Sequence, residues 1–178
     1  MIQKSVEFEK KATLTVAELM GAAARTAPKG NGNDNLEVLI VTGKEKNDLA
    51  QEMKNIKEKT GVDFFERDGY SVDSSTVVVL MGTRISPIGC PNCGFCGFEN
   101  CDENRKNNGI CSFNTGDLGI AIGSAVSVAA DHRCDNRVLF SAGKAALNLK
   151  YFSEEVKIAY GIPLSVSGKS PFFDRKED

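Results

Sequence analysis

The stretch "STVVVLMG", residues 75–82, is the most strand-like segment of the 178-residue chain. Its valines are β-branched, and they run without interruption into Leu80 and Met81. A continuous apolar run of this length is typical of a strand that is buried on both faces of a sheet. We therefore expect this segment to lie in the core of one domain, with other layers packed on both of its sides.

Helical and strand patterns alternate on either side of this segment. A capping-box spacing at Thr15 and Glu18 predicts a helix that ends at Pro28, and it leaves residues 4–11 as a charged arm. Residues 62–65 fit a short strand. The other expected elements are a strand at residues 36–43, a helix that ends at Gly61, an apolar helix at residues 117–130 and a last strand at residues 156–164. This alternation is compatible with both α/β and α+β architecture.

The strand leads directly into "GCPNCGFCGFENCDENRKNNGIC", residues 89–111, which holds five of the six cysteines. Short gaps between cysteines let a tight turn present several thiolates to one face, as cubane iron–sulfur clusters require. Gly89, Gly94 and Gly97 permit such turns and leave backbone N–H groups free to point at a negatively charged cluster. The segment is therefore predicted to be a cluster-binding loop, residues 89–111, inserted near the middle of the chain.

Two sets of four ligands fit the spacing. One set is Cys90, Cys93, Cys96 and Cys101, and the other is Cys93, Cys96, Cys101 and Cys111. We prefer the second, because "CGFCGFENC" resembles the core of the small four-iron domain of electron-transport subunits and corrinoid iron–sulfur proteins. Zinc held by four thiolates is the alternative, although zinc knuckles are normally two pairs separated by a dozen or more residues.

Composition excludes several classes of function. The formal net charge is -2, with acidic and basic residues interspersed, so no basic stripe is available for nucleic acid. The longest apolar run, residues 118–130, is shorter than the roughly 20 residues of a membrane-spanning helix. No apolar export segment follows Met1, so we expect a cytoplasmic protein with reduced thiols.

Both ends of the chain resemble flavin-dependent nitroreductases. The similarity lies in "AARTAPKGNGNDNLEVLIVTG", residues 23–43, in "VKIAYGIPLSVSGKSPFFDRK", residues 156–176, and in the helix "DLGIAIGSAVSVAA". With the cysteine loop, these features resemble the uncharacterised ferredoxin-domain-containing proteins of anaerobic bacteria and archaea. The resemblance implies an α+β fold: a nitroreductase-like, three-layer mixed sheet with helices, formed by residues 1–178 as a single domain.

The same resemblance implies a possible second cofactor, FMN, and a homodimer, because nitroreductases build their flavin sites between subunits. The expected flavin contacts are Lys29, Gly30, Asn31 and Asn33 in the loop after Pro28, with Lys169 and Arg175 at the phosphate. The chain departs from the family where an Arg-Ser-x-Arg phosphate clamp is usual, since only Lys10 and Lys11 lie near that position. The residues therefore leave flavin binding open.

Three further polar residues have ordinary structural explanations. His132, the only histidine, follows the apolar helix, and we expect it to lie at the end of that helix without a catalytic role. Asp117 at the helix start is expected to complement the helix dipole. Cys134 lies apart from the loop and is expected to be no ligand.

Two functions from different classes follow. The first is a redox protein, and potentially a flavin and iron–sulfur oxidoreductase, that passes single electrons through a [4Fe-4S] cluster to an unidentified partner or to flavin. The alternative is a binding or assembly module in which zinc or a cluster only stabilises the loop.

Overall fold

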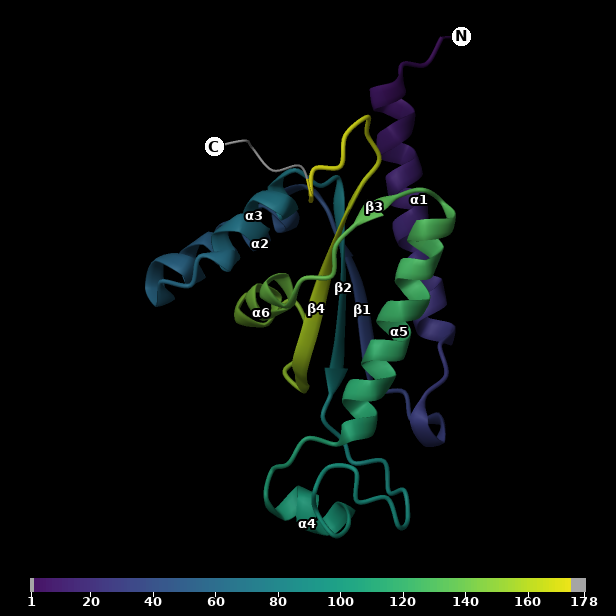
Figure 1. Ribbon diagram of the computed structural model, residues 1–178, viewed down its shortest axis with the longest axis vertical. Coiled ribbons are helices and arrows are strands. Elements are labelled where there is room, and N and C mark those ends of the chain that lie inside the picture. The colour runs from purple at the N-terminus through teal and green to yellow at the C-terminus, as the bar shows by residue number, and fades with distance from the viewer. Residues whose placement is uncertain (1, 174–178) are drawn as a thin grey trace.

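Strand β2, Val77–Arg84, occupies the centre of the sheet in the computed structural model, which describes residues 2–173 (Figure 1). The described chain forms a four-stranded sheet in the order β1-β2-β4-β3. The other strands are β1 (Leu36–Val41), β3 (Asp135–Asn136) and β4 (Val156–Ser165). Leu80 pairs with Leu39 on one side and with Gly161 on the other, so β2 has a hydrogen-bonded neighbour at both edges.

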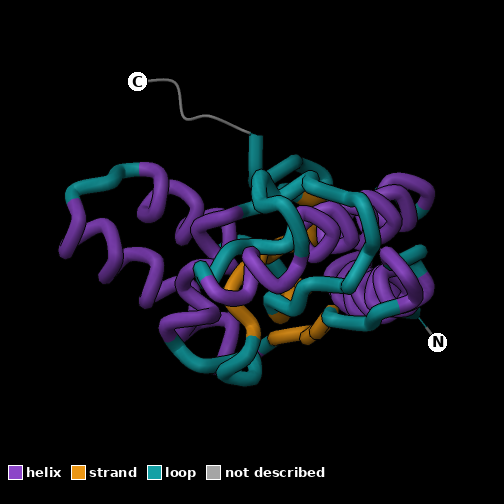
Figure 2. Tube along the Cα trace, turned by 90° about the horizontal axis from the view of Figure 1, so that it is seen from below, coloured by secondary structure: helices purple, strands orange, loops and turns teal. Residues whose placement is uncertain are grey.

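Helices cover both faces of this sheet (Figures 1 and 2). The helices of the described chain are α1 (Ser5–Thr26), α2 (Gly43–Thr60), α3 (Phe64–Asp73), α4 (Cys101–Lys106), α5 (Ser112–Asp131), α6 (Phe140–Asn148) and the short 3-10 helix η1 (Gly30–Gly32). Helices α1 and α5 pack on one face, and α2, α3 and α6 lie on the other. The α+β class and the three layers agree with the expectation from sequence.

Alternation along β2 explains why both of its faces are buried. Val77, Val79 and Met81 point into the core beneath α1 and α5, whereas Val78 and Leu80 point into the core beneath α2 and α6. All five side chains are at most 1% exposed. The apolar run therefore supplies the centre of two cores, as its sequence predicts.

The sheet is antiparallel in every described pair, so the expected mixed sheet is wrong. The reason lies in the connection between β1 and β2. Helix α2 leads away from the sheet, and α3 packs against it and leads back (Figure 1). Because two helices return the chain to the end of the sheet that β1 left, β2 must run opposite to β1. A single-helix crossover would have made the pair parallel.

Two local expectations also fail. Residues 4–11 are not an arm, because α1 begins at Ser5 with Lys4 at its N-cap. The Thr15 hydroxyl donates to the Lys11 carbonyl inside that helix instead of capping it. Residues 62–65 are not a strand, because α3 begins at Phe64. Phe65 belongs to α3 and packs in the core with α2 and α6.

The cysteine segment lies beyond the end of the sheet where β2 terminates, and it leads into α5 (Figure 1). Apart from the six-residue α4, it contains turns and irregular backbone. No helix within residues 2–173 combines the length and the apolar character that crossing a bilayer requires.

Candidate metal centre and adjoining groove

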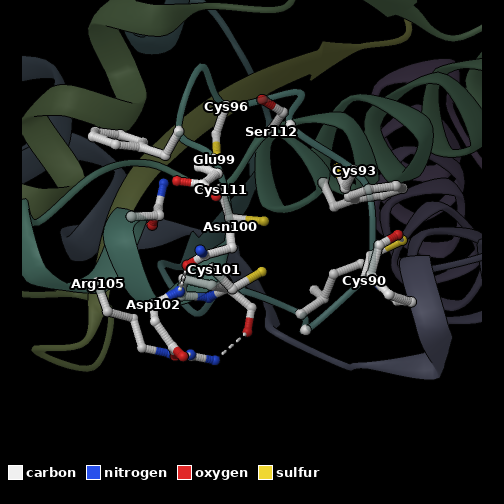
Figure 3. A pocket seen from close by; sticks show the side chains of 18 of the residues that line it. Cys90, Cys93, Cys96, Glu99, Asn100, Cys101, Asp102, Arg105, Cys111 and Ser112 are labelled. Carbon is white, nitrogen blue, oxygen red and sulfur yellow. Dashed lines mark hydrogen bonds and ion pairs between the residues drawn. The ribbon is translucent and has the colours of Figure 1, made fainter.

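The cysteine loop encloses a cavity of about 280 Å³. The five loop cysteines all line it: Cys90, Cys93, Cys96, Cys101 and Cys111. Cys90 and Cys93 lie on one side of the cavity, and Cys96, Cys101 and Cys111 lie on the other (Figure 3). The five cysteines that are close in sequence thus also share one cavity in the fold.

Backbone turns on either side of Cys96 bring the thiols to the cavity. Gly94 has a φ of 61° and Gly97 a φ of 84°, both in the left-handed region that residues with a side chain rarely adopt. The Gly97 N–H donates to the Gly94 carbonyl at 2.9 Å and closes a tight turn around Cys96. The expected role of the loop glycines in forming turns is thus seen at these positions.

Two helix N-termini also face the cavity. Cys101 is the first residue of α4, which is capped by the Asn100 side chain as it accepts from the N–H groups of Asp102 and Glu103, both at 3.0 Å. Cys111 is buried and occupies the N-cap of the 20-residue α5. The positive end of a helix dipole stabilises nearby negative charge, so the N-terminus of α5 favours an anionic cluster in this cavity.

The donor set fits a polynuclear iron–sulfur group. Soft thiolates are the usual ligands of such clusters, and the cavity exceeds by far the roughly 10–15 Å³ that one water requires by this measure. Within residues 2–173, no three His, Cys, Asp or Glu side chains are arranged to hold one ion. Both Cys90 and Cys111 line the cavity, so the two ligand sets inferred from sequence remain alternatives.

Cys134 does not belong to this site. It follows the C-terminus of α5, whereas Cys111 precedes the N-terminus, and a 20-residue helix is roughly 30 Å long. Its thiol is 3% exposed and lies 3.6 Å from the Ser165 carbonyl, to which it can donate. Burial in the apolar core raises the pKa of Cys134 to about 11. Cys134 is therefore a thiol of the core beneath α1 and α5, far from the cavity.

A shallow groove of about 410 Å³ adjoins the cavity. One wall comes from the loop after α1, at Pro28, Lys29 and Gly30. The rest of the lining comes from the first turns of α5 and from the cysteine loop: Phe95, Ser112, Phe113, Gly116, Asp117 and Ile120. Ser112 and Phe113 also line the cavity, so the two spaces share a wall.

The loop residues expected at a flavin have different positions. Lys29 and Gly30 line the groove, whereas the side-chain amides of Asn31 and Asn33 each donate to the Ile88 carbonyl at 3.4 Å. The Lys29 ammonium donates to backbone carbonyls at the end of α1, and the Gly30 N–H donates to Asp117. The loop therefore uses these donors to brace itself against α1, α5 and the start of the cysteine segment.

Lys169 lies near the other end of the sheet. Val77 pairs with Leu164 and Leu36 with Thr83, so β4 ends where β2 begins, roughly 25 Å from the end that carries the groove. Val166, just after β4, lines a separate hollow of about 550 Å³ together with Lys10. Arg175 lies outside the described residues. One chain thus does not bring Lys169 to Lys29 and Gly30.

Asp117 has a larger role than its sequence position suggests. It is the sixth residue of α5, is 6% exposed, and accepts the Gly30 N–H with both carboxylate oxygens at 3.0 Å. It therefore anchors the groove loop to α5 instead of complementing the helix dipole. His132 occupies the C-cap of α5 and is exposed, in agreement with the expected helix-end position.

Comparisons of sequence identify the family. The family described as "Uncharacterized protein containing a ferredoxin domain (DUF2148)" matches residues 107–175. An uncharacterized protein of Archaeoglobus fulgidus is 38% identical over 183 residues, which cover 98% of this chain and 98% of that protein. The chain belongs to this ferredoxin-domain family.

Solved structures show the fold of this ferredoxin-domain family member. It is similar to the nitroreductase CinD from Lactococcus lactis in complex with nicotinic acid, with a TM-score of 0.61 and 14% identity over 99% of this chain and 86% of that chain. A nitroreductase with bound FMN from Desulfitobacterium hafniense DCB-2 has a TM-score of 0.57 and 16% identity, covering 95% of this chain and 81% of that chain. The fold is that of the nitroreductases.

Proposed function

We propose that this protein is an iron–sulfur redox protein, in which Cys93, Cys96, Cys101 and Cys111 bind a [4Fe-4S] cluster. When bound, such a cluster supplies single-electron transfer. The observation that carries the proposal is that five thiols line one cavity, which shares a wall with an apolar groove. Membership of a ferredoxin-domain family and the nitroreductase fold support it. In this proposal residues 1–178 form one domain, and residues 89–111 are its cluster loop.

The protein's own contribution is to hold the thiols and to favour negative charge. The turns at Gly94 and Gly97 and the N-termini of α4 and α5 set the positions of the thiols. The burial of Cys111 limits access of water to one side of the cavity. In this proposal a separate redox protein exchanges electrons with the cluster. An electron acceptor bound in the groove would be separated from the cluster by Phe113, which lines both spaces.

Anaerobic purification tests the cluster. We expect brown protein with about four iron and four sulfide per chain and broad visible absorption that bleaches with dithionite. Colourless protein that contains stoichiometric zinc, and that stays folded and spectrally silent under dithionite, would instead support a metal-stabilised binding module.

We further propose that the groove binds FMN in a homodimer, with the ring on the Lys29 and Gly30 side of one subunit. The phosphate would meet Lys169 and Arg175 of the second subunit, because Lys169 and the groove lie at opposite ends of the sheet within one chain. Nitroreductase-fold structures with FMN support this arrangement. In the same arrangement, Lys10 beside Val166 would add positive charge near the phosphate.

The phosphate contacts predict the effect of a double substitution. We expect FMN to bind saturably to cluster-loaded protein, and Lys169→Ala with Arg175→Ala to weaken binding, since each charged contact contributes on the order of 1–3 kcal/mol. Fluorescence quenching during FMN titration measures this. Lys59→Ala with Lys157→Ala removes the same charge from other parts of the surface and should leave affinity unchanged. Equal affinity in both double variants would exclude the proposed phosphate site.

The exposed face of α5 predicts a dimer. A Cβ at Gly116, Gly119 or Gly123 would meet nothing within 4 Å, and Ile120 on the same side is 48% exposed. A second copy could approach this helix closely and cover Ile120. Sedimentation velocity at low-micromolar concentration should give a dimer, and Gly123→Arg should shift it to monomer. A wild-type monomer would contradict both the dimer and the shared flavin site.

A further inference from the structure

We propose that Asp117 selects the ligand of the groove, by accepting a hydrogen bond from an N–H group at the edge of a flat heteroaromatic ring. This inference rests on the proposed flavin-binding function and adds to it the residue that recognises the ring. The ligand class is a conjugated ring that carries an edge N–H donor, as isoalloxazine does. A quinone of similar size, whose edge offers only carbonyl acceptors, would be disfavoured.

The hydrogen bonding of Asp117 is incomplete within the chain. Both carboxylate oxygens accept from one N–H group, that of Gly30, although an ionised carboxylate offers about four acceptor positions. No ion pair among residues 2–173 involves Asp117. A carboxylate that is 6% exposed is costly to bury unless further donors reach it, so a donor from a ligand would stabilise it.

Asp117 is part of the groove lining, so a ligand in the groove could reach its remaining acceptor positions. Asp117 lines the groove together with Gly116 and Ile120 of the same helix. The only other charged side chain in this lining is Lys29, whose ammonium donates to the carbonyls of Arg25 and Ala27 at 2.7 and 2.9 Å. The groove therefore offers a ligand one buried acceptor in largely apolar surroundings.

The shape of the groove favours a flat ring. Phe95 and Phe113 are stacked, with ring centroids 6.0 Å apart and an interplanar angle of 16°, and Phe95 is 75% exposed. Gly116 and Gly30 have no side chain, and a Cβ at Gly30 would lie 2.8 Å from the Phe113 ring. A planar ligand could pack against these aromatic and glycine surfaces with its edge at Asp117. Apolar contacts would hold the ring, and the carboxylate would decide which edge is accepted.

A combined change of ligand and protein isolates this contact. Lumiflavin has the isoalloxazine ring without a phosphate chain, and 3-methyllumiflavin lacks the N3–H donor. Both are titrated by fluorescence quenching into cluster-loaded wild type and into Asp117→Asn. The asparagine side chain can still accept the Gly30 N–H, so this substitution keeps the loop anchored. Asp131→Asn changes an exposed carboxylate at the other end of α5 and is the matched control.

The N-methyl group should affect ligand affinity differently in wild type and in Asp117→Asn. We expect methylation to weaken binding to wild type and to Asp131→Asn by about 10- to 100-fold, the range for a hydrogen bond to a charged group. In Asp117→Asn the same methylation should change affinity by less than about threefold. Menadione, a quinone, should bind this variant more tightly than wild type, because a carboxamide N–H can donate to its carbonyl.

Several results would overturn the inference. Equal effects of methylation in wild type and Asp117→Asn would show that the methyl group acts by bulk alone. A wild type that binds lumiflavin and 3-methyllumiflavin equally, or binds neither, would also exclude Asp117 as the selecting residue. Iron and sulfide content are measured on every sample, so failure of the cluster is detected separately. Thermal melting of Asp117→Asn confirms that the variant is folded.

Discussion

Serine in place of Cys101 is expected to leave the purified protein without iron or acid-labile sulfide. The hydroxyl oxygen of serine is a poor substitute for a soft thiolate on iron, and Cys101 is fixed at the first residue of α4 by the Asn100 cap. The same loss is expected at Cys93, Cys96 and Cys111. Iron and sulfide analysis after anaerobic purification, with the visible spectrum, measures the loss.

Cys134→Ser is the matched control for this series. It makes the same atomic change roughly 30 Å away, beyond the far end of α5, and should retain the full cluster in whatever fraction of the protein folds. Cys90→Ser decides between the two ligand sets. If Cys90→Ser loses all iron while Cys111→Ser keeps a full cluster, the ligands are Cys90, Cys93, Cys96 and Cys101 instead.

Local pattern predicts the parts of the fold whose determinants are contiguous in sequence. The valine-rich run of β2 fixes a strand with two buried faces, and the αL cap at Gly61 ends α2 as expected. The direction of β2 relative to β1 depends on whether one helix or two connect them. The pattern of residues 62–65 fits a short strand as well as it fits the start of a helix, because periodicity does not distinguish the two in a short apolar run. Because α3 was not predicted there, the sequence did not indicate that β1 and β2 pair antiparallel.

In the candidate site, too, local features can be predicted from the sequence and long-range contacts cannot. Cysteine spacing is a local signal, and it identifies the five thiols that line the cavity. The Gly30 to Asp117 hydrogen bond joins residues 87 positions apart, and no local pattern reports such a contact. Asn31 and Asn33 were expected to contact a ligand because they are polar loop residues. In the fold their side-chain amides donate to the Ile88 carbonyl instead, a contact that the sequence does not indicate. The only sequence feature that points to the Gly30 to Asp117 contact is the charged Asp117 beside the small and apolar residues 118–130.

Alanine in place of Gly143 is expected to destabilise the fold severely. Gly143 lies in α6, where the helix crosses β4, and a Cβ there would lie 1.9 Å from the Ala159 carbonyl oxygen and 2.6 Å from the Tyr160 nitrogen. These are backbone atoms of a strand that is hydrogen-bonded to β2, so they cannot move aside as a flexible side chain would. Helix α6 would have to shift away from the sheet and open the core around Val78 and Leu80.

The size of the effect follows from two opposing contributions. Overpacking of a core costs about 1–3 kcal/mol and occasionally more, whereas a glycine-to-alanine change inside a helix normally gains about 1 kcal/mol. At Gly143 the Cβ would meet backbone atoms, so we expect a clash above this range, of about 4 kcal/mol. The net loss is then about 3 kcal/mol, a large part of the roughly 5–15 kcal/mol that stabilises a typical domain. Urea unfolding of the purified protein measures the free energy of unfolding.

Gly21→Ala makes the same chemical change in α1 and provides the contrast. A Cβ at Gly21 would lie 3.8 Å from Val38, an ordinary van der Waals contact. This variant should therefore gain stability, by up to about 1 kcal/mol, through its higher helix propensity. Opposite signs at the two positions would show that the close approach of α6 to β4 is what requires glycine. If Gly143→Ala were as stable as Gly21→Ala, α6 could not cross β4 at this distance.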